Sequence, residues 1–142
     1  MAGRTTLTII KPDAFGAGKA GKILAHLEAQ GFRVLAARVT HLSDAEAGAF
    51  YEVHRERPFF GSLTKFMPSA PCMPMILEKA DAVAALRAAI GATDPAEAAA
   101  GTVRKLFAES KEKNAIHASD SDENAEREAR FFFADTEVLR AR

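Results

Sequence analysis

The chain is organised around the stretch Asn114-Ala115-Ile116-His117-Ala118-Ser119-Asp120-Ser121. Ala115 and Ile116 are typical of the end of a short buried strand, and the polar residues 119–122 are of types that cap a helix. We therefore expect His117 to lie where a strand ends and a helix begins. One ring nitrogen of a histidine can attack an electrophile while an acceptor holds the other. A single histidine is more often a core or surface residue without chemistry, so its neighbours decide between the two interpretations.

The composition indicates a single domain without a strong electrostatic field. The chain has 142 residues, of which 19 are Lys or Arg and 19 are Asp or Glu. We expect one domain over residues 1–142, because a chain of this length supports one hydrophobic core. The balanced charge disfavours binding to nucleic acid or to an anionic membrane, so an anion site has to be local.

The cysteine content and hydropathy predict a soluble cytoplasmic protein. The one cysteine, Cys72, lies in an apolar run from Pro71 to Leu77 and has no internal partner, so we expect a buried and reduced thiol. The N-terminal residues lack the apolar core of a signal peptide, and no apolar segment approaches the roughly 20 residues that a membrane span needs.

Strand and helix patterns alternate in the first part of the chain. Residues 5–10 are β-branched and apolar and predict a central strand, which Pro12 ends. Apolar side chains at helical spacing predict a helix from residue 20 to residue 30, and residues 32–40 predict a second strand. Ser43 and Glu46 form a capping box that starts the next helix.

The second part of the chain contains a helical hairpin and a long irregular segment. A short helix beginning at Phe59-Phe60 follows the helix capped by Ser43, so the two form a hairpin. Residues 73–78 predict a third strand, in which Pro74 indicates an edge position or an early bulge. A third helix is expected at residues 82–90, followed by an irregular region with one helical turn at residues 102–107 and by a last helix at residues 125–133.

Several candidate residues also have an ordinary interpretation. Lys11 at the end of the first strand and Glu128 on the last helix are of a type that is usually solvated, and Tyr51 on a helix face is more often part of the core. Arg87 is equally compatible with a solvated side chain and with a phosphate ligand, which guanidinium geometry suits. These residues gain a functional interpretation only together with the motifs around them.

Three motifs occur together: Asn-x-x-His-x-Ser-Asp-Ser at residues 114–121, Lys11-Pro12-Asp13-Ala14, and Arg57-Pro58-Phe59-Phe60. In this combination and order they closely resemble the nucleoside diphosphate kinase family over essentially the whole chain. The resemblance implies an α+β, ferredoxin-like βαββαβ fold with a four-stranded antiparallel sheet covered by helices, a helical hairpin and a long loop before the last strand. It also implies reversible ping-pong transfer of the γ-phosphate from a nucleoside triphosphate to a nucleoside diphosphate through a phosphohistidine.

The resemblance also implies which residues form the site. The catalytic residues implied are His117, Lys11, Glu128, Ser119 and Tyr51. The nucleotide-binding residues implied are Lys11, His54, Phe59, Arg87, Thr93, Arg104, Lys111 and Asn114. An exposed ring such as that of Phe59 can stack on any base at roughly 1–3 kcal/mol, so loose base specificity is expected. The sequence contains no dedicated carboxylate cage, so Mg²⁺ is expected to bind with the nucleotide phosphates. The resemblance further implies a homo-oligomer, either a tetramer or a hexamer.

Three positions depart from the family pattern. Ala118 and Ala70 stand where glycine is usual, and if position 118 needs a positive φ, alanine there costs about 1 kcal/mol. Lys111 stands where an apolar residue usually closes over the base, although its methylene groups can still cover one.

Two other classes of function compete with the kinase. One is a ferredoxin-like oligomer that binds nucleotides or nucleic acid with weak or no catalysis, which an exposed aromatic residue and cations would also suit. The other is a structural or regulatory oligomer. Replacement of His117 by alanine separates the binding class from the kinase, because only the kinase needs this imidazole. The structural or regulatory class predicts that nucleotide leaves the assembly unchanged in a sizing experiment and that transfer is absent.

Overall fold

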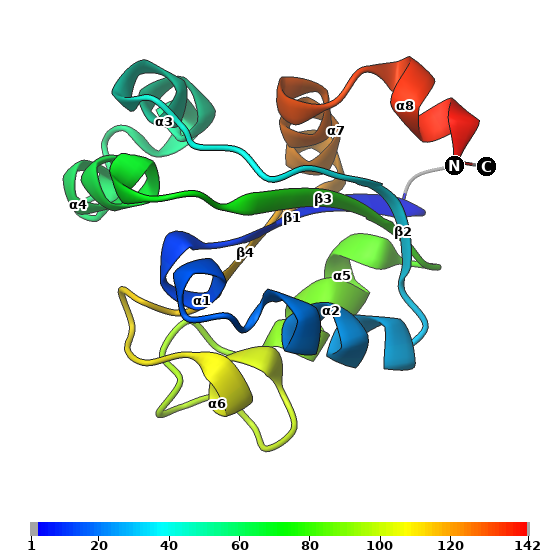
Figure 1. Cartoon of the computed structure of the whole chain (residues 1–142), viewed down its shortest axis with the longest axis horizontal. Helices are drawn as coiled ribbons and strands as arrows, with labels where there is room; N and C mark the ends of the chain where they lie inside the picture. Colours follow the sequence, from blue (N-terminus) through cyan, green and yellow to red (C-terminus); the bar gives the residue numbers. More distant parts are fainter. Residues whose placement is uncertain (1–2, 142) are drawn as a thin grey trace.

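The computed structural model describes residues 3–141 and consists of one sheet with helices on both of its faces (Figure 1). The strands are β1 (Thr5–Ile10), β2 (Arg33–Ala37), β3 (Met73–Glu78) and β4 (Ile116–Ala118). The helices are α1 (Pro12–Gly16), α2 (Ala20–Ala29), α3 (Asp44–Phe50), α4 (Phe60–Phe66), α5 (Ala82–Ile90), α6 (Val103–Phe107), α7 (Asp122–Phe132) and α8 (Asp135–Arg140), with 3-10 turns η1 (Glu52–His54) and η2 (Met67–Ser69).

The sheet is antiparallel and its strands lie in the order β2-β3-β1-β4. β1 pairs with β3 along its whole length, from Thr5 opposite Glu78 to Ile10 opposite Met73. On its other side β1 pairs with β4, and His117 lies opposite Ile9. With α2 and α5 as the two connecting helices, this order confirms the expected ferredoxin-like fold.

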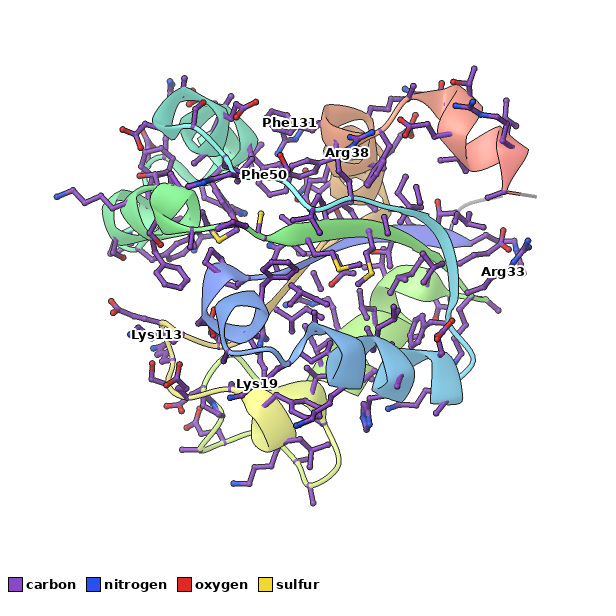
Figure 2. All side chains as sticks on the ribbon, in the orientation of Figure 1. Lys19, Arg33, Arg38, Phe50, Lys113 and Phe131 are labelled. Atoms are coloured by element: carbon purple, nitrogen blue, oxygen red, sulfur yellow. The ribbon has the colours of Figure 1, made fainter. Side chains whose placement is uncertain are left out.

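Alternation along the strands creates a hydrophobic core on each face of the sheet. Ile10 points to the face covered by α2 and α5, where it clusters with Leu27. Leu7 and Ile9 point to the opposite face, where they cluster with Phe50 under the α3–α4 hairpin and α7 (Figure 2). Each of these side chains is at most 1% exposed, and full burial of such a group contributes about 1.5–3 kcal/mol.

The expected edge position for the proline-containing strand is wrong. β3 lies between β2 and β1, and the irregularity in its pairing is in β2, between Val34 and Ala36. The carbonyl of Pro74 accepts a hydrogen bond from the Arg38 amide at 3.1 Å, beyond the end of β2 at Ala37. The backbone nitrogen of Pro74, which carries no hydrogen, is on the side where β2 has already ended. No strand hydrogen bond is lost there, so a central strand tolerates the proline.

The expected position of His117 at the end of a strand is also wrong. β4 begins at Ile116, and His117 is its middle residue. Ala115 lies outside the strand because its φ is 74°, whereas strand pairing requires extended backbone. The predicted cap of the last helix is confirmed, because the Asn124 amide donates to Ser121 Oγ at 3.0 Å. The short helix α1, after Lys11, had not been predicted.

The alanines that replace family glycines cause no backbone strain. Among the described residues other than glycine, only Asp81 and Ala115 have a positive φ, so the strain considered for Ala118 is absent at that position. Ala70 is extended, with φ −163° and ψ 169°, which any residue adopts.

The helical hairpin and its capping box are confirmed. Ser43 Oγ accepts from the Glu46 amide at 3.1 Å, and Glu46 Oε1 accepts from the Ser43 amide at 2.8 Å. α3 then runs to Phe50, and α4 returns along it after η1. The hairpin projects beyond one end of the sheet (Figure 1).

The long segment between α5 and β4 contains α6, at the position of the predicted helical turn. Gly91 starts this segment with φ +87°, and a Cβ there would lie 2.6 Å from Thr102 Oγ1, so the turn requires glycine. None of the described helices has the length and hydropathy needed to cross a membrane.

Candidate functional site

A cavity of about 600 Å³ is lined by residues of the α3–α4 hairpin, of the loop that precedes β4 and of the segment after β1. The predicted cations Lys11, Arg104 and Lys111 line it. The predicted residues Tyr51, Phe59, Thr93, Asn114 and His117 also line it. The fold therefore brings together residues that are up to 106 positions apart in the chain, from Lys11 to His117.

A buried carboxylate contacts one ring nitrogen of His117. Nε2 lies 2.7 Å from Glu128 Oε1, which also accepts from Ser119 Oγ at 2.8 Å. Glu128 is 3% exposed and Ser119 is 1% exposed, so neither lies in the cavity. The carboxylate selects the tautomer with hydrogen on Nε2. Nδ1 then carries a lone pair, and it has no hydrogen bond to any residue of the described chain.

Backbone and ring contacts fix the orientation of this imidazole. The carbonyl of His117 accepts from Thr8 Oγ1 at 2.6 Å, in addition to the β1–β4 pairing. The rings of Phe50 and Tyr51 meet the imidazole edge to face, with centroids 5.4 Å and 5.9 Å away. Such packing restricts the ring to one rotamer.

Lys11 places a buried ammonium group in the cavity. Its Nζ donates to Asn114 Oδ1 at 2.8 Å and to the Glu112 carbonyl at 3.3 Å, and it lies 5.5 Å from the centroid of the Phe66 ring. Burial lowers the pKa of Lys11 to about 8, although the Asp13 carboxylate acts in the opposite direction. An anion in the cavity would favour the charged form of this group.

Arg104 supports the backbone around the cavity and also lines it. Its guanidinium donates to the carbonyls of Asn114, Gly91 and Ile116 at 3.3, 3.1 and 2.7 Å. These bonds use three of its five N–H groups, so two remain for a ligand. Burial, together with the nearby charge of Arg87, lowers the pKa of Arg104 to about 10, so the group is still a cation at neutral pH.

Two of the predicted nucleotide-binding residues lie outside the lining of the cavity. Arg87 is exposed on α5, and its Nη1 lies 3.5 Å from the Ala118 carbonyl. His54 packs against the ring of Phe59, with centroids 5.8 Å apart, at the hairpin. Of the three cations that were predicted to converge, Lys11 and Arg104 line the cavity, whereas Arg87 does not.

The hydroxyl of Tyr51 is a buried donor without a partner. Tyr51 is 2% exposed and lines the cavity, and its OH makes no hydrogen bond among the described residues. Burial, and secondarily the Glu128 carboxylate, raise the pKa of Tyr51 well above its ordinary value. The group therefore stays protonated and can donate to an oxygen atom of a ligand.

The remaining predicted residues form the outer part of the cavity. Phe59 is 46% exposed, and Thr93 and Lys111 are also exposed. Asn114 is buried, and its amide nitrogen donates to the Thr93 carbonyl at 3.3 Å. Since an amide has two donors and two acceptor lone pairs, Asn114 keeps capacity for a ligand.

Sequence reasoning missed three residues that shape the site. Asp13 was part of a family motif but was given no role in the site, and its carboxylate accepts a hydrogen bond from the Ala115 amide at 3.0 Å. Phe66 was not among the predicted site residues, and it lines the cavity beside Lys11. Glu112 also lines the cavity, and no local pattern distinguishes it.

Chemically, the cavity is suited to receive an anionic electrophile. The His117 imidazole, two buried cations and a phenolic donor line it, and an exposed aromatic ring stands at its outer part. Preorganised charges in a water-poor site stabilise charge that develops in a transition state.

Comparisons with known proteins point to one family. The family model for nucleoside diphosphate kinase matches residues 4–138. The nucleoside diphosphate kinase of Chlorobium luteolum is 60% identical over 136 residues, which are 96% of this chain and 97% of that protein. That of Gluconobacter oxydans is 53% identical over 139 residues, 98% of this chain and 99% of that protein. The crystal structure of the Aquifex aeolicus nucleoside diphosphate kinase superposes with a TM-score of 0.93 at 45% identity, covering 95% of this chain and 98% of that one.

Proposed function

The chain belongs to the nucleoside diphosphate kinase family, whose enzymes act on nucleotides, and we propose that it transfers phosphate through a covalent intermediate on Nδ1 of His117. The observation that carries this proposal is the 2.7 Å contact between His117 Nε2 and Glu128 Oε1. It leaves Nδ1 as the unprotonated nitrogen, in a cavity lined by Lys11 and Arg104.

The reaction has two half-reactions that use the same nitrogen. In the first, the Nδ1 lone pair of His117 attacks the γ-phosphorus of a nucleoside triphosphate. An N–P bond forms, the P–O bond to the β-phosphate breaks, and the nucleoside diphosphate leaves with the electron pair of that bond. In the second, a β-phosphate oxygen of another nucleoside diphosphate attacks the same phosphorus, and the N–P bond breaks. Covalent catalysis of this kind gives ping-pong kinetics.

Glu128 and Ser119 are positioning residues in this scheme. No proton leaves the imidazole during the attack, so the phosphorylated ring is a cation that keeps its hydrogen on Nε2. The Glu128 carboxylate stabilises this cation at 2.7 Å, and Ser119 holds the carboxylate by its own hydrogen bond at 2.8 Å. Ser119 thus acts on the imidazole through Glu128.

Lys11, Arg104 and Tyr51 would stabilise the transferring phosphoryl group. Phosphoryl transfer depends mainly on positioning and on stabilisation of charge on the phosphate oxygens. The two cations supply charge, and the unpartnered Tyr51 hydroxyl supplies a hydrogen bond. Loss of one such donor typically lowers kcat about 100- to 1000-fold.

The outer part of the cavity would hold the nucleoside. Phe59 offers an exposed face for the base, Lys111 covers the base with its methylene stem, and Asn114 and Thr93 contact the sugar and phosphates. Arg87 and His54, which lie outside the lining, would act on phosphates only after a movement of their side chains.

Mg²⁺ belongs to the nucleotide substrate in this scheme. No group of three or more His, Cys, Asp or Glu side chains that could hold a metal exists within residues 3–141. We infer that the nucleotide phosphates hold the ion, which neutralises part of their charge when bound.

A pulse-chase experiment tests the covalent intermediate. We expect γ-labelled ATP with Mg²⁺ to label the protein in a single turnover, with a label that resists base and is lost in acid. A chase with unlabelled GDP should move the label to GTP. His117→Ala should remain unlabelled while it still binds ADP. His41→Ala, at an exposed histidine whose Nε2 hydrogen-bonds the Pro68 carbonyl, should label normally.

Two outcomes would contradict the proposal. Labelling of His117→Ala would place the intermediate on another residue. An unlabelled wild type that binds ADP would favour the alternative of a nucleotide-binding oligomer without chemistry.

We further infer that residues 1–142 form one domain that works as a homo-oligomer, a tetramer or a hexamer, in the cytoplasm and without nucleic acid. The single buried cysteine supports the cytoplasmic location. The balanced charge supports the absence of nucleic acid. Val39, Leu106 and Leu139, which are 57%, 53% and 66% exposed, would gain stability from contact with a second copy. Sedimentation velocity at micromolar concentration tests the assembly, and a monomer would contradict it.

A further inference from the structure

The residue two positions before the nucleophile has a strained backbone. Ala115 is fully buried and has φ 74°, a conformation that alanine rarely adopts. The Ile116 amide donates to the Asn114 carbonyl at 2.9 Å. This bond spans a single residue, so Ala115 is the centre of a γ-turn of the strained, positive-φ type.

The Lys11–Asp13 segment holds both polar backbone groups of this turn. The Lys11 amide donates to the Ala115 carbonyl at 2.9 Å. The Ala115 amide donates to Asp13 Oδ2 at 3.0 Å. Asp13 lies in the first turn of α1, directly after the end of β1. A strained conformation persists only where its surroundings hold it, and here the holding groups come from a segment about 100 positions earlier in the chain.

The strained turn decides where the site residues on either side of it point. Before the turn, the Asn114 side chain reaches Lys11 at 2.8 Å. After the turn, β4 begins and His117 faces the same cavity. Extended backbone at Ala115 would shift the alternation of side chains along this segment. Asn114 and His117 could then no longer share the cavity in their present positions.

We propose that Asp13 is a positioning residue for phosphate transfer, whose carboxylate holds the γ-turn at Ala115 and so keeps Asn114 and His117 directed into the cavity. This inference rests on the proposed role of His117. Asp13 does not line the cavity, so it would act only through the Ala115 backbone. The competing explanation is that Asp13 acts as a negative charge beside Lys11.

Glycine at position 115 distinguishes these explanations, because glycine adopts a positive φ without strain. We expect Asp13→Ala to lower the single-turnover rate of His117 labelling about 10- to 100-fold. In the Ala115→Gly background the same change should lower it less than about 3-fold. Ala118→Gly is the matched control, because Ala118 is in β4 without a positive φ, and it should not rescue Asp13→Ala. ADP affinity should change less than the labelling rate.

Asp13→Asn keeps an oxygen acceptor and removes the charge. We expect it to label within about 3-fold of wild type, and it replaces Asp13→Ala if that variant does not fold. The inference is overturned if Asp13→Ala labels at the wild-type rate, if Ala115→Gly fails to rescue it, or if folded Asp13→Asn is as slow as Asp13→Ala. If the wild type itself is not labelled on His117, the proposed function fails instead.

Discussion

Lys11 is the residue whose burial makes the cavity sensitive to pH. Its pKa is about 8 in the folded protein, against 10.5 for the ordinary group, chiefly because burial disfavours the ammonium form. The folded protein therefore releases this proton first as the pH rises. Burial of the charged form reduces stability below about pH 8, and this cost disappears as the pH rises from about 8 to 10.5.

This lowered pKa predicts that ADP binding takes up a proton. The phosphates favour charged Lys11, so at about pH 8.5 binding should be accompanied by uptake of up to about one proton. Affinity should also weaken as the pH rises above about 8. Isothermal titration in buffers of different ionisation enthalpy measures the uptake. The uptake should vanish in Lys11→Met, and equal uptake in that variant would show that another group titrates.

At the scale of elements, α7 connects the site to the hydrophobic core under the α3–α4 hairpin. It carries Glu128, and Ser121 caps its N-terminus with a 3.0 Å bond from the Asn124 amide. Its C-terminal end is tied to the end of β2 by Arg38, which donates to the Phe132 carbonyl and, at 2.9 Å, to Glu137 on α8 (Figure 2). The arginine also lies over the Phe133 ring.

The cap of α7 predicts a measurable stability effect. Ser121→Ala should lower the free energy of unfolding by about 1 kcal/mol, because it leaves a helix amide without its acceptor. The midpoint of thermal unfolding should fall by about 3 °C. Ser43→Ala, which removes the equivalent cap from α3, should have a similar effect in urea denaturation. A loss below about 0.3 kcal/mol in both variants would mean that solvent replaces these caps.

At the scale of the whole molecule, the cavity joins three parts of the chain that fold against one another. The hairpin, the long segment with α6, and β4 contribute to its lining, and Lys11 adds to it from the end of β1. The sheet between the two hydrophobic cores holds these parts in place. A ligand that fills the cavity therefore binds only the folded chain. Its binding free energy adds directly to the stability of the fold.

This linkage predicts strong stabilisation by nucleotide. ADP at about 100 times its dissociation constant should raise the free energy of unfolding by about 2.7 kcal/mol. Adenosine at the same concentration should raise it much less, because the cations of the cavity have no phosphate to contact. Urea denaturation followed by circular dichroism measures both. Equal shifts with the two ligands would place the binding energy in the base rather than in the phosphates.

Features that depend on a few neighbouring residues could be predicted from the sequence. The capping box at Ser43, the cap at Ser121, the hairpin, and the turn at residues 102–107 are local patterns, and the structure contains each of them. The family motifs, which combine several such local patterns, indicated the antiparallel sheet and the residues that gather at the cavity.

The tertiary structure decided what depends on distant partners. Pro74 is in a central strand only because β2 ends beside it, and Ala115 keeps its strained backbone only because Lys11 and Asp13 hold it. The positions of Arg87 and His54 outside the cavity lining likewise follow from packing. Backbone conformation and burial are set by contacts between segments about 100 residues apart, and local sequence patterns do not contain that information.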